Sequence, residues 1–97
     1  MDLEIYDLEI DEWNETEMAR HRVRPIEAVQ VLDGEPVFLP NKKPHAASVV
    51  MIGPTHGGRL LTVPLAPTAR PGVWRPATAW DASDGERARY RNAGGSR

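Results

Sequence analysis

The chain has 97 residues, the length of a single domain, and its 40% hydrophobic and 27% charged residues are ordinary values for a globular protein. The absence of cysteine excludes disulfide frameworks, thiolate zinc sites and a cysteine nucleophile. No apolar run approaches the roughly 18 residues of a membrane helix, and the acidic first residues lack the pattern of a signal peptide. We therefore expect a soluble, cytoplasmic protein with one domain over residues 1–92 and a disordered tail over 93–97, without a cofactor, a metal or membrane contact.

The two halves of the chain carry opposite charge. Residues 1–40 hold 11 acidic and three basic residues, whereas residues 41–97 hold three acidic and nine basic residues. The net charges are −8 and +6, which together give the −2 of the whole chain. A basic half suits an anion, a nucleic acid or an acidic protein as partner. The alternative is that the two halves neutralise each other within the molecule, and the sequence leaves both interpretations open.

The first third of the chain predicts a short strand followed by a helix. Apolar residues alternate within residues 3–10 but change phase midway, so only one short strand fits. A helix is expected over residues 14–21, with Asn14 as its N-cap and Trp13 packing on Met18.

A second helix is expected to begin at Pro25, which suits the first helical position, and to end at Asp33-Gly34. Helical spacing relates Ile26, Val29 and Leu32 within it. The two helices resemble a helix–turn–helix pair, but the acidic sequence around them does not favour a role in reading DNA.

The rest of the chain predicts four strands and a last helix. The expected strands, separated by Pro and Gly, are Pro36–Leu39, Ala47–Ile52, Arg59–Leu65 and Val73–Ala79. The second and third of these are expected to form a hairpin. A capping box at Ser83 and Glu86 opens a helix that runs to about Asn92. The order β-α-α-β-β-β-β-α predicts an α+β fold in which an antiparallel sheet packs against the helix pair.

Several short motifs resemble those of the BrnT family of bacterial toxins. The family's Trp-Asp or Trp-Asn element, His-Gly-Val segment, central strand and Ala-Arg-x-Ala … Glu-Arg-x-x-Tyr ending are resembled by segments across residues 13–91. The matching segments are Trp13-Asn14, His21–Ala28, Ile52-Gly53, Ala79–Ala82, and Glu86-Arg87 with Tyr90. The shared order and spacing of the motifs carry the resemblance more than any single motif does.

The resemblance implies the toxin of a bacterial type II toxin–antitoxin pair. Such toxins have a RelE-like fold, cleave RNA without a metal and are neutralised by a cognate antitoxin that also represses the operon. This chain departs from the family pattern at Ser48 and Trp80, where the family often carries Arg. These departures favour an alternative, a catalytically silent RelE-like binding protein that acts through its antitoxin or nucleic acid. A third interpretation is a small housekeeping domain.

Metal-free RNA cleavage requires a base for the 2′-OH, an acid for the leaving oxygen and cations for the charge that grows on phosphorus. His21, His45 and His56 have side chains suited to proton transfer, and no pair of them has zinc-ligand spacing. The candidate catalytic residues are Arg59, Arg75, His45 and Tyr90. The candidate RNA-binding residues are Lys42, Lys43, Arg87, Arg91 and Trp80.

Each candidate also has a structural interpretation. Surface arginines with packed stems account for Arg59 and Arg75, and a place in the core accounts for Tyr90. The expected partners are an antitoxin protein and an RNA substrate, with a dimer or a hetero-oligomer with the antitoxin as the assembly.

Overall fold

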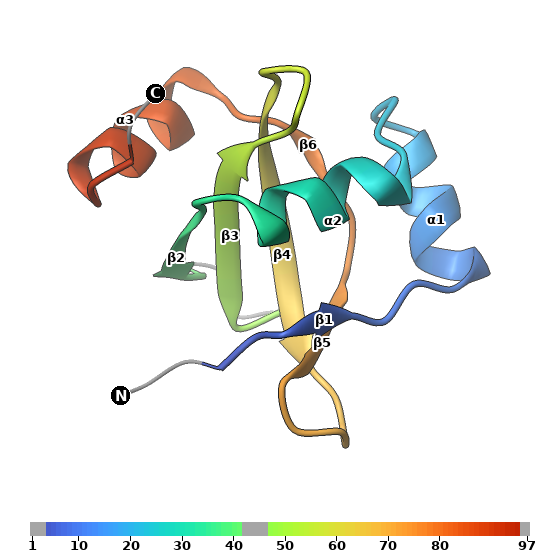
Figure 1. Cartoon of the computed structure of the whole chain (residues 1–97). Helices are drawn as coiled ribbons and strands as arrows, with labels where there is room; N and C mark the ends of the chain where they lie inside the picture. Colours follow the sequence, from blue (N-terminus) through green and yellow to red (C-terminus); the bar gives the residue numbers. More distant parts are fainter. Residues whose placement is uncertain (1–3, 42–46, 96–97) are drawn as a thin grey trace.

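Strand β4 lies at the centre of the sheet in a computed structural model of the chain, which describes residues 4–41 and 47–95 (Figure 1). The elements are β1 (Asp7–Leu8), α1 (Glu12–Ala19), α2 (Pro25–Asp33), β2 (Val37–Pro40), β3 (Val49–Pro54), β4 (Leu60–Pro67), β5 (Val73–Pro76), β6 (Trp80–Asp81) and α3 (Asp84–Asn92). The strand order is β1-β5-β4-β3-β2, and β6 pairs with β4 beside β5. All pairs are antiparallel except β1 with β5. The expected α+β class is therefore confirmed, as is a mostly antiparallel sheet.

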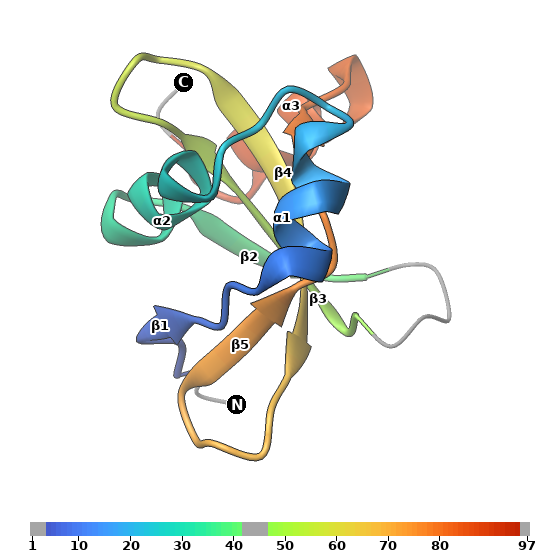
Figure 2. The ribbon, with the colours of Figure 1, turned by 90° about the vertical axis from the view of Figure 1, so that its right-hand side faces the viewer.

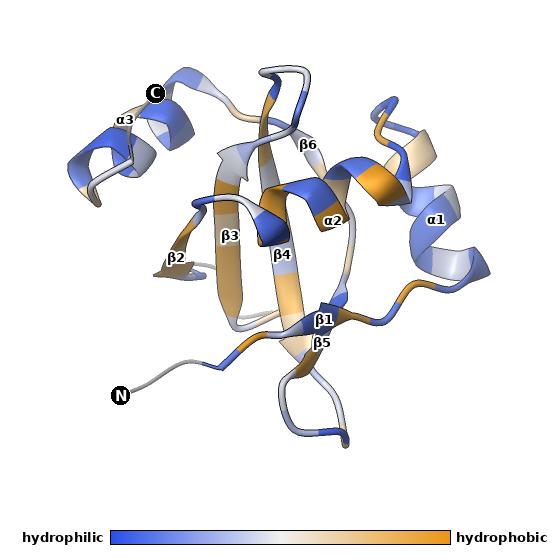
Figure 3. Cartoon of the chain, viewed as in Figure 1, coloured by the Kyte–Doolittle hydropathy of each residue, from blue (hydrophilic) through white to orange (hydrophobic). Residues whose placement is uncertain are grey.

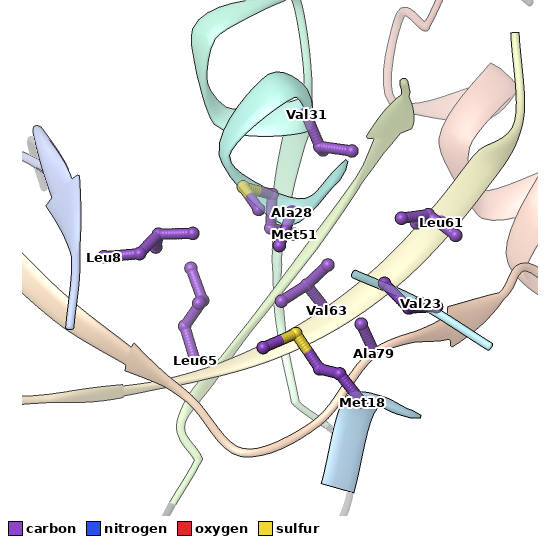
Figure 4. Close-up of a cluster of buried hydrophobic side chains, with 10 residues drawn as sticks. All are labelled: Leu8, Met18, Val23, Ala28, Val31, Met51, Leu61, Val63, Leu65 and Ala79. Atoms are coloured by element: carbon purple, nitrogen blue, oxygen red, sulfur yellow. The ribbon is translucent and has the colours of Figure 1, made fainter. Parts of the chain in front are cut away.

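The sheet buries apolar side chains on both faces because successive residues of a strand point to opposite sides. On one face, residues of β3 and β4 pack against residues of α1 and α2 (Figure 4). This cluster comprises Leu8, Met18, Val23, Ala28, Val31, Met51, Leu61, Val63, Leu65 and Ala79. On the other face, Tyr90 of α3 packs on Val50, Ile52 and Leu60. The helix pair thus covers one face and α3 covers part of the other, and Figure 3 shows hydrophobic colour concentrated on β3 and β4.

Helix α1 begins earlier than expected. Asp11 is the N-cap, and its side chain accepts a hydrogen bond from the backbone N–H of Asn14 at 2.9 Å. Asn14 returns the bond by accepting from the Asp11 N–H at 2.9 Å, and its Nδ2 donates to the Glu9 carbonyl at 2.8 Å. The prediction of Asn14 as N-cap was therefore wrong by three positions, since Asn14 is the buried reciprocal member of the capping box. Trp13 is 58% exposed and does not join the cluster that contains Met18.

The turn between α1 and α2 ends α1 with a left-handed residue. The Val23 N–H donates to the Met18 carbonyl at 3.0 Å and the Arg22 N–H donates to the Ala19 carbonyl at 3.0 Å, the two bonds of a Schellman motif. Arg22 has φ 59°, a conformation that glycine adopts at lower cost than other residues. Met18 and Val23 are both buried, so the turn is fixed by packing as well as by hydrogen bonds.

The expected strand over residues 73–79 ends at Pro76 in the structure, and a further strand that was not predicted, β6, follows at Trp80–Asp81. Strand β5 pairs with the carboxyl-terminal part of β4, and β6 pairs with Leu61 and Thr62 near its start. Pro76, which has no N–H to donate, ends β5. Both strands therefore lie along the same edge of β4, one after the other.

The end of the described chain closes helix α3. Gly94 has φ 97°, and the Gly95 N–H donates to the Tyr90 carbonyl at 2.8 Å. A Cβ at Gly95 would lie 2.4 Å from the Tyr90 ring, so only glycine permits this approach. Residues 93–95 of the expected tail are part of this helix end, and residues 96–97 lie outside the described residues. Within the described ranges, no helix has the length and apolar character needed to cross a membrane.

Candidate functional site

Arg59, which directly precedes β4, lies at the centre of a network of charged hydrogen bonds. Its Nε and Nη2 donate to the two carboxylate oxygens of Asp81, at 2.6 and 3.1 Å. Nη1 donates to Glu27 at 3.2 Å and to the Arg22 carbonyl at 2.7 Å, and Nη2 also donates to the His21 carbonyl at 3.2 Å. The five N–H groups of the guanidinium are therefore all used within the chain. Arg59 joins α2, β6 and the turn after α1, and it has no donor left for an RNA phosphate.

The electrostatics of this network favour the charged form of each member. The Asp81 carboxylate raises the pKa of Arg59, and the Arg59 guanidinium in turn lowers the pKa of Asp81. The Arg24 backbone N–H and the Arg59 guanidinium lower the pKa of Glu27. The Arg59 side chain is only 26% exposed, so these interactions are partly shielded from water. This arrangement is that of a structural ion-pair network.

Arg75 of β5 is held by carboxylates from the acidic segment that precedes α1. Its Nη1 pairs with Asp11 and lies 3.5 Å from Glu9 Oε2. The guanidinium carbon also lies 5.7 Å from the centre of the Trp13 ring, within the range of a cation–π contact. The Arg75 guanidinium lowers the pKa of Asp11, and Asp11 raises the pKa of Arg75. Arg75 is thus neutralised within the chain.

The two candidate catalytic arginines are not brought together. Arg59 precedes the first residue of β4, whereas Arg75 pairs with Ala66, near the other end of the same strand. Seven residues of extended chain separate Arg59 from Ala66, a distance of about 20 Å. A single phosphate is therefore too small to contact both guanidinium groups.

Tyr90 lies in the core. Its side chain has no exposed surface, and it packs with Val50, Ile52 and Leu60. Its buried hydroxyl has no hydrogen-bond partner within the described part of the chain. The structure therefore places the Tyr90 hydroxyl away from solvent and from any RNA on the surface.

Trp80 is half-buried and takes part in the capping of α3. Its Nε1 donates to Glu86 Oε1 at 3.0 Å, and the same oxygen accepts the Ser83 backbone N–H at 2.8 Å. Although burial opposes its ionisation, these hydrogen bonds lower the pKa of Glu86. The His21 ring packs edge-on against Trp80, with the ring centres 6.1 Å apart. Glu86 thus has the capping role that its position predicts, and Trp80 is one of its donors.

Helix α3 presents two neighbouring cations that remain available. Arg87 and Arg91 are exposed and form no ion pair with any residue that the structure describes. They are four residues apart and so lie on the same side of the helix. Arg89 Nη2 donates to the Pro40 carbonyl at 3.2 Å, which fixes α3 beside the end of β2. The exposed pair is the described feature best suited to bind an anion.

The remaining residues that the sequence singled out are not part of these charged networks. Lys42, Lys43 and His45 lie outside the described residues. His56 is exposed in the turn between β3 and β4, and its backbone N–H donates to Gln30 Oε1 at 3.1 Å. Ser48 is exposed just before β3. No group of three or more potential metal ligands was found over residues 4–41 and 47–95.

No sequence pattern indicates which carboxylates engage the two arginines. Glu27 and Asp81 approach Arg59 from 32 and 22 residues away, and Asp11 approaches Arg75 from 64 residues away. The excess of acidic residues in the first 40 positions was the available signal for Asp11 and Glu27, but it does not specify which pairs form and does not include Asp81. No protein-family model matches the chain, and no curated protein matches it at a level that identifies a relative.

Proposed function

We propose that this chain is the toxin component of a bacterial type II toxin–antitoxin pair, with a RelE-like fold of the BrnT kind. Support comes from the positions that carry the resemblance to that family. Asn14 closes the capping box of α1, His21 and Val23 belong to the turn that leads to α2, and Tyr90 anchors α3. The residues that carry the resemblance therefore have structural roles in α1, in the turn before α2 and in α3.

The surface of α3 carries the proposed binding function. The observation that supports it is the contrast between two kinds of arginine. Arg59 and Arg75 are engaged by carboxylates, whereas Arg87 and Arg91 are exposed and unpaired with described residues. Guanidinium groups bind phosphate and carboxylate oxygens through paired hydrogen bonds. We therefore assign RNA phosphates, and the acidic segment of an antitoxin, to this surface.

RNA cleavage would use the 2′-OH of the substrate as nucleophile, so no metal is needed in principle. The protein would supply a proton acceptor, a proton donor and cations. Arg87 and Arg91 are suited to the last role, and His45 is the histidine that the sequence places nearest to β2 in the chain. Tyr90 is excluded from proton transfer by its burial.

The second candidate function is a catalytically silent protein of the same kind, which acts by binding its antitoxin or nucleic acid. The burial of Tyr90 and the engagement of Arg59 and Arg75 favour it, because three of the four candidate catalytic residues are then structural. The two functions share the α3 surface and differ only in chemistry.

Induction in a bacterial host distinguishes these functions. Expression of the chain alone is expected to arrest growth, and co-expression of the neighbouring gene is expected to restore it. The purified protein is then incubated with RNA in the presence of EDTA. Cleavage supports the ribonuclease, and arrest without cleavage supports the silent binding protein. Normal growth at confirmed high expression would contradict the toxin function.

A further inference from the structure

The opposite charges of the two halves are only partly neutralised within the molecule. Arg59 is matched by Glu27 and Asp81, and Arg75 is matched by Glu9 and Asp11. The charges of α1 and α3 do not meet, because these helices lie at opposite ends of the molecule (Figures 1 and 2). What remains is an acidic helix at one end and a basic helix at the other.

Helix α1 carries an exposed aromatic groove. A shallow depression of about 490 Å³ is lined by Glu12, Trp13, Thr16, Glu17 and Arg20. Trp13 is 58% exposed although the Arg75 guanidinium lies over its ring. Within the described chain, the Glu12 side chain forms no ion pair, and the Glu17–Arg20 pair at 3.0 Å is on the surface. An indole beside the unpaired Glu12 carboxylate is a surface that favours an arginine side chain.

Helix α3 carries the complementary feature. Arg87 and Arg91 repeat at one helical turn, about 5.4 Å, as do Trp13 and Glu17 on α1. Two arginines at this spacing match an indole and a carboxylate at the same spacing. The contact requires two molecules, because the α1 and α3 of one chain lie on opposite sides of the molecule (Figure 1).

We infer that the α1 groove binds the arginines of α3 from a second copy of this chain. One guanidinium lies against the indole of Trp13 and the other pairs with the carboxylates of Glu12 and Glu17. Since each copy uses a different surface toward each neighbour, the association is head-to-tail and does not close by two-fold symmetry. Two short helices bury less than a standard interface, so the association is weak and is sensitive to salt. The inference does not depend on the proposed function, although a ligand on α3 would compete with it.

The test uses the full chain in sedimentation velocity over a concentration series. Association is expected at about 0.05 M salt and is expected to be lost at about 0.5 M salt. Two double variants each remove one surface. The variant E12Q/W13S removes a carboxylate and the indole of the groove, and the variant R87Q/R91Q removes the two cations of α3. Each variant alone is expected to remain monomeric. The control variant Ile26→Ser removes another exposed apolar side chain, 51% exposed and outside the groove, and is expected to associate as the unmodified chain does.

Mixing the two variants gives the decisive result. Each retains the surface that the other lacks, so an equimolar mixture is expected to form dimers and no larger species. A chain that stays monomeric up to about 1 mM at low salt would overturn the inference. So would association that survives in both variants, or a mixture that stays monomeric. A monomeric chain that binds an oligo-arginine peptide through Trp13 would show that another cationic partner occupies the groove.

Discussion

The Arg59 guanidinium and the Asp81 carboxylate form a two-point ion pair, with distances of 2.6 Å from Nε to Oδ1 and 3.1 Å from Nη2 to Oδ2. The pair links the start of β4 to β6, a strand of only two residues. It therefore fixes the segment that leads directly into α3. Arg59, whose own N–H groups are all used within the chain, thus helps to position Arg87 and Arg91 of α3.

Replacing Arg59 with Lys is expected to destabilise the protein by about 2 kcal/mol, because a single ammonium has three N–H donors and lacks the planar fork that meets both Asp81 oxygens. The measurement is urea unfolding at neutral pH. The matched control is Arg70→Lys on an exposed loop, which is expected to change stability by less than about 0.5 kcal/mol. Equal stabilities for the two variants would contradict the role assigned to Arg59.

The same network predicts a loss of stability in acid. Because the folded-state pKa values of Glu27 and Asp81 are lowered, the unfolded chain binds protons more readily than the folded chain. The stabilisation is therefore complete well above about pH 4, the ordinary pKa of these groups, and is lost as pH falls through the lower folded-state values. Arg59→Met removes the cation, so the stability difference between it and the unmodified protein is expected to shrink toward low pH. The unfolding midpoints of both proteins are measured across this pH range. A difference between them that stays constant with pH would contradict the role assigned to Glu27 and Asp81.

Arg22→Gly is expected to stabilise the protein by about 0.5–1 kcal/mol, because it relieves the left-handed conformation at φ 59°. The Arg22 carbonyl, which accepts from Arg59, is retained in this variant. Arg20→Gly is the control, because Arg20 has φ −60°, so glycine relieves no strain there, adds backbone entropy to the unfolded chain and removes the surface pair with Glu17. The midpoint temperature of thermal unfolding is expected to rise for Arg22→Gly and to fall for Arg20→Gly. The reverse order would argue against strain at Arg22.

Tyr90→Phe separates a core residue from a catalytic one. The hydroxyl is buried without a described partner, so its removal is expected to leave stability unchanged or raised, whereas Tyr90→Ala is expected to cost about 3–5 kcal/mol. Any RNA cleavage by the unmodified protein is expected to persist in Tyr90→Phe. A stable Tyr90→Phe variant that has lost cleavage would restore the hydroxyl to the reaction.

Local signals in the sequence predicted the elements well. The capping box of Ser83 and Glu86 is present, with the Glu86 N–H donating to Ser83 Oγ at 3.2 Å, and Pro25 begins α2 as expected. Both features depend on residues within one helical turn, so a single stretch of chain contains the information. The N-cap of α1 was misplaced because Asp11 and Asn14 exchange reciprocal bonds, and either residue type suits the cap.

The candidate site was harder to predict because its outcome depends on long-range pairing. Arg59 and Arg75 have side chains and sequence positions that suit phosphate binding. In the folded chain, however, they form ion pairs with acidic residues from distant segments. Tyr90 has the same helical spacing whether it faces the sheet or the solvent, and only the position of α3 over Val50 and Ile52 decides between them. Arg87 and Arg91 remained available because no described acidic side chain forms an ion pair with either of them.

The central claim is that the α3 arginines bind an anionic ligand, and the salt dependence of RNA binding tests it most directly. Arg87→Ala with Arg91→Ala is compared with Arg20→Ala and Arg24→Ala, which removes the same charge from exposed positions elsewhere. If both α3 residues contact phosphates of single-stranded RNA, the slope of log K against log salt is expected to fall in magnitude by about 1.4 in the α3 variant and to stay unchanged in the control. A folded α3 variant with an unchanged slope, or an equal fall in both variants, would contradict the claim.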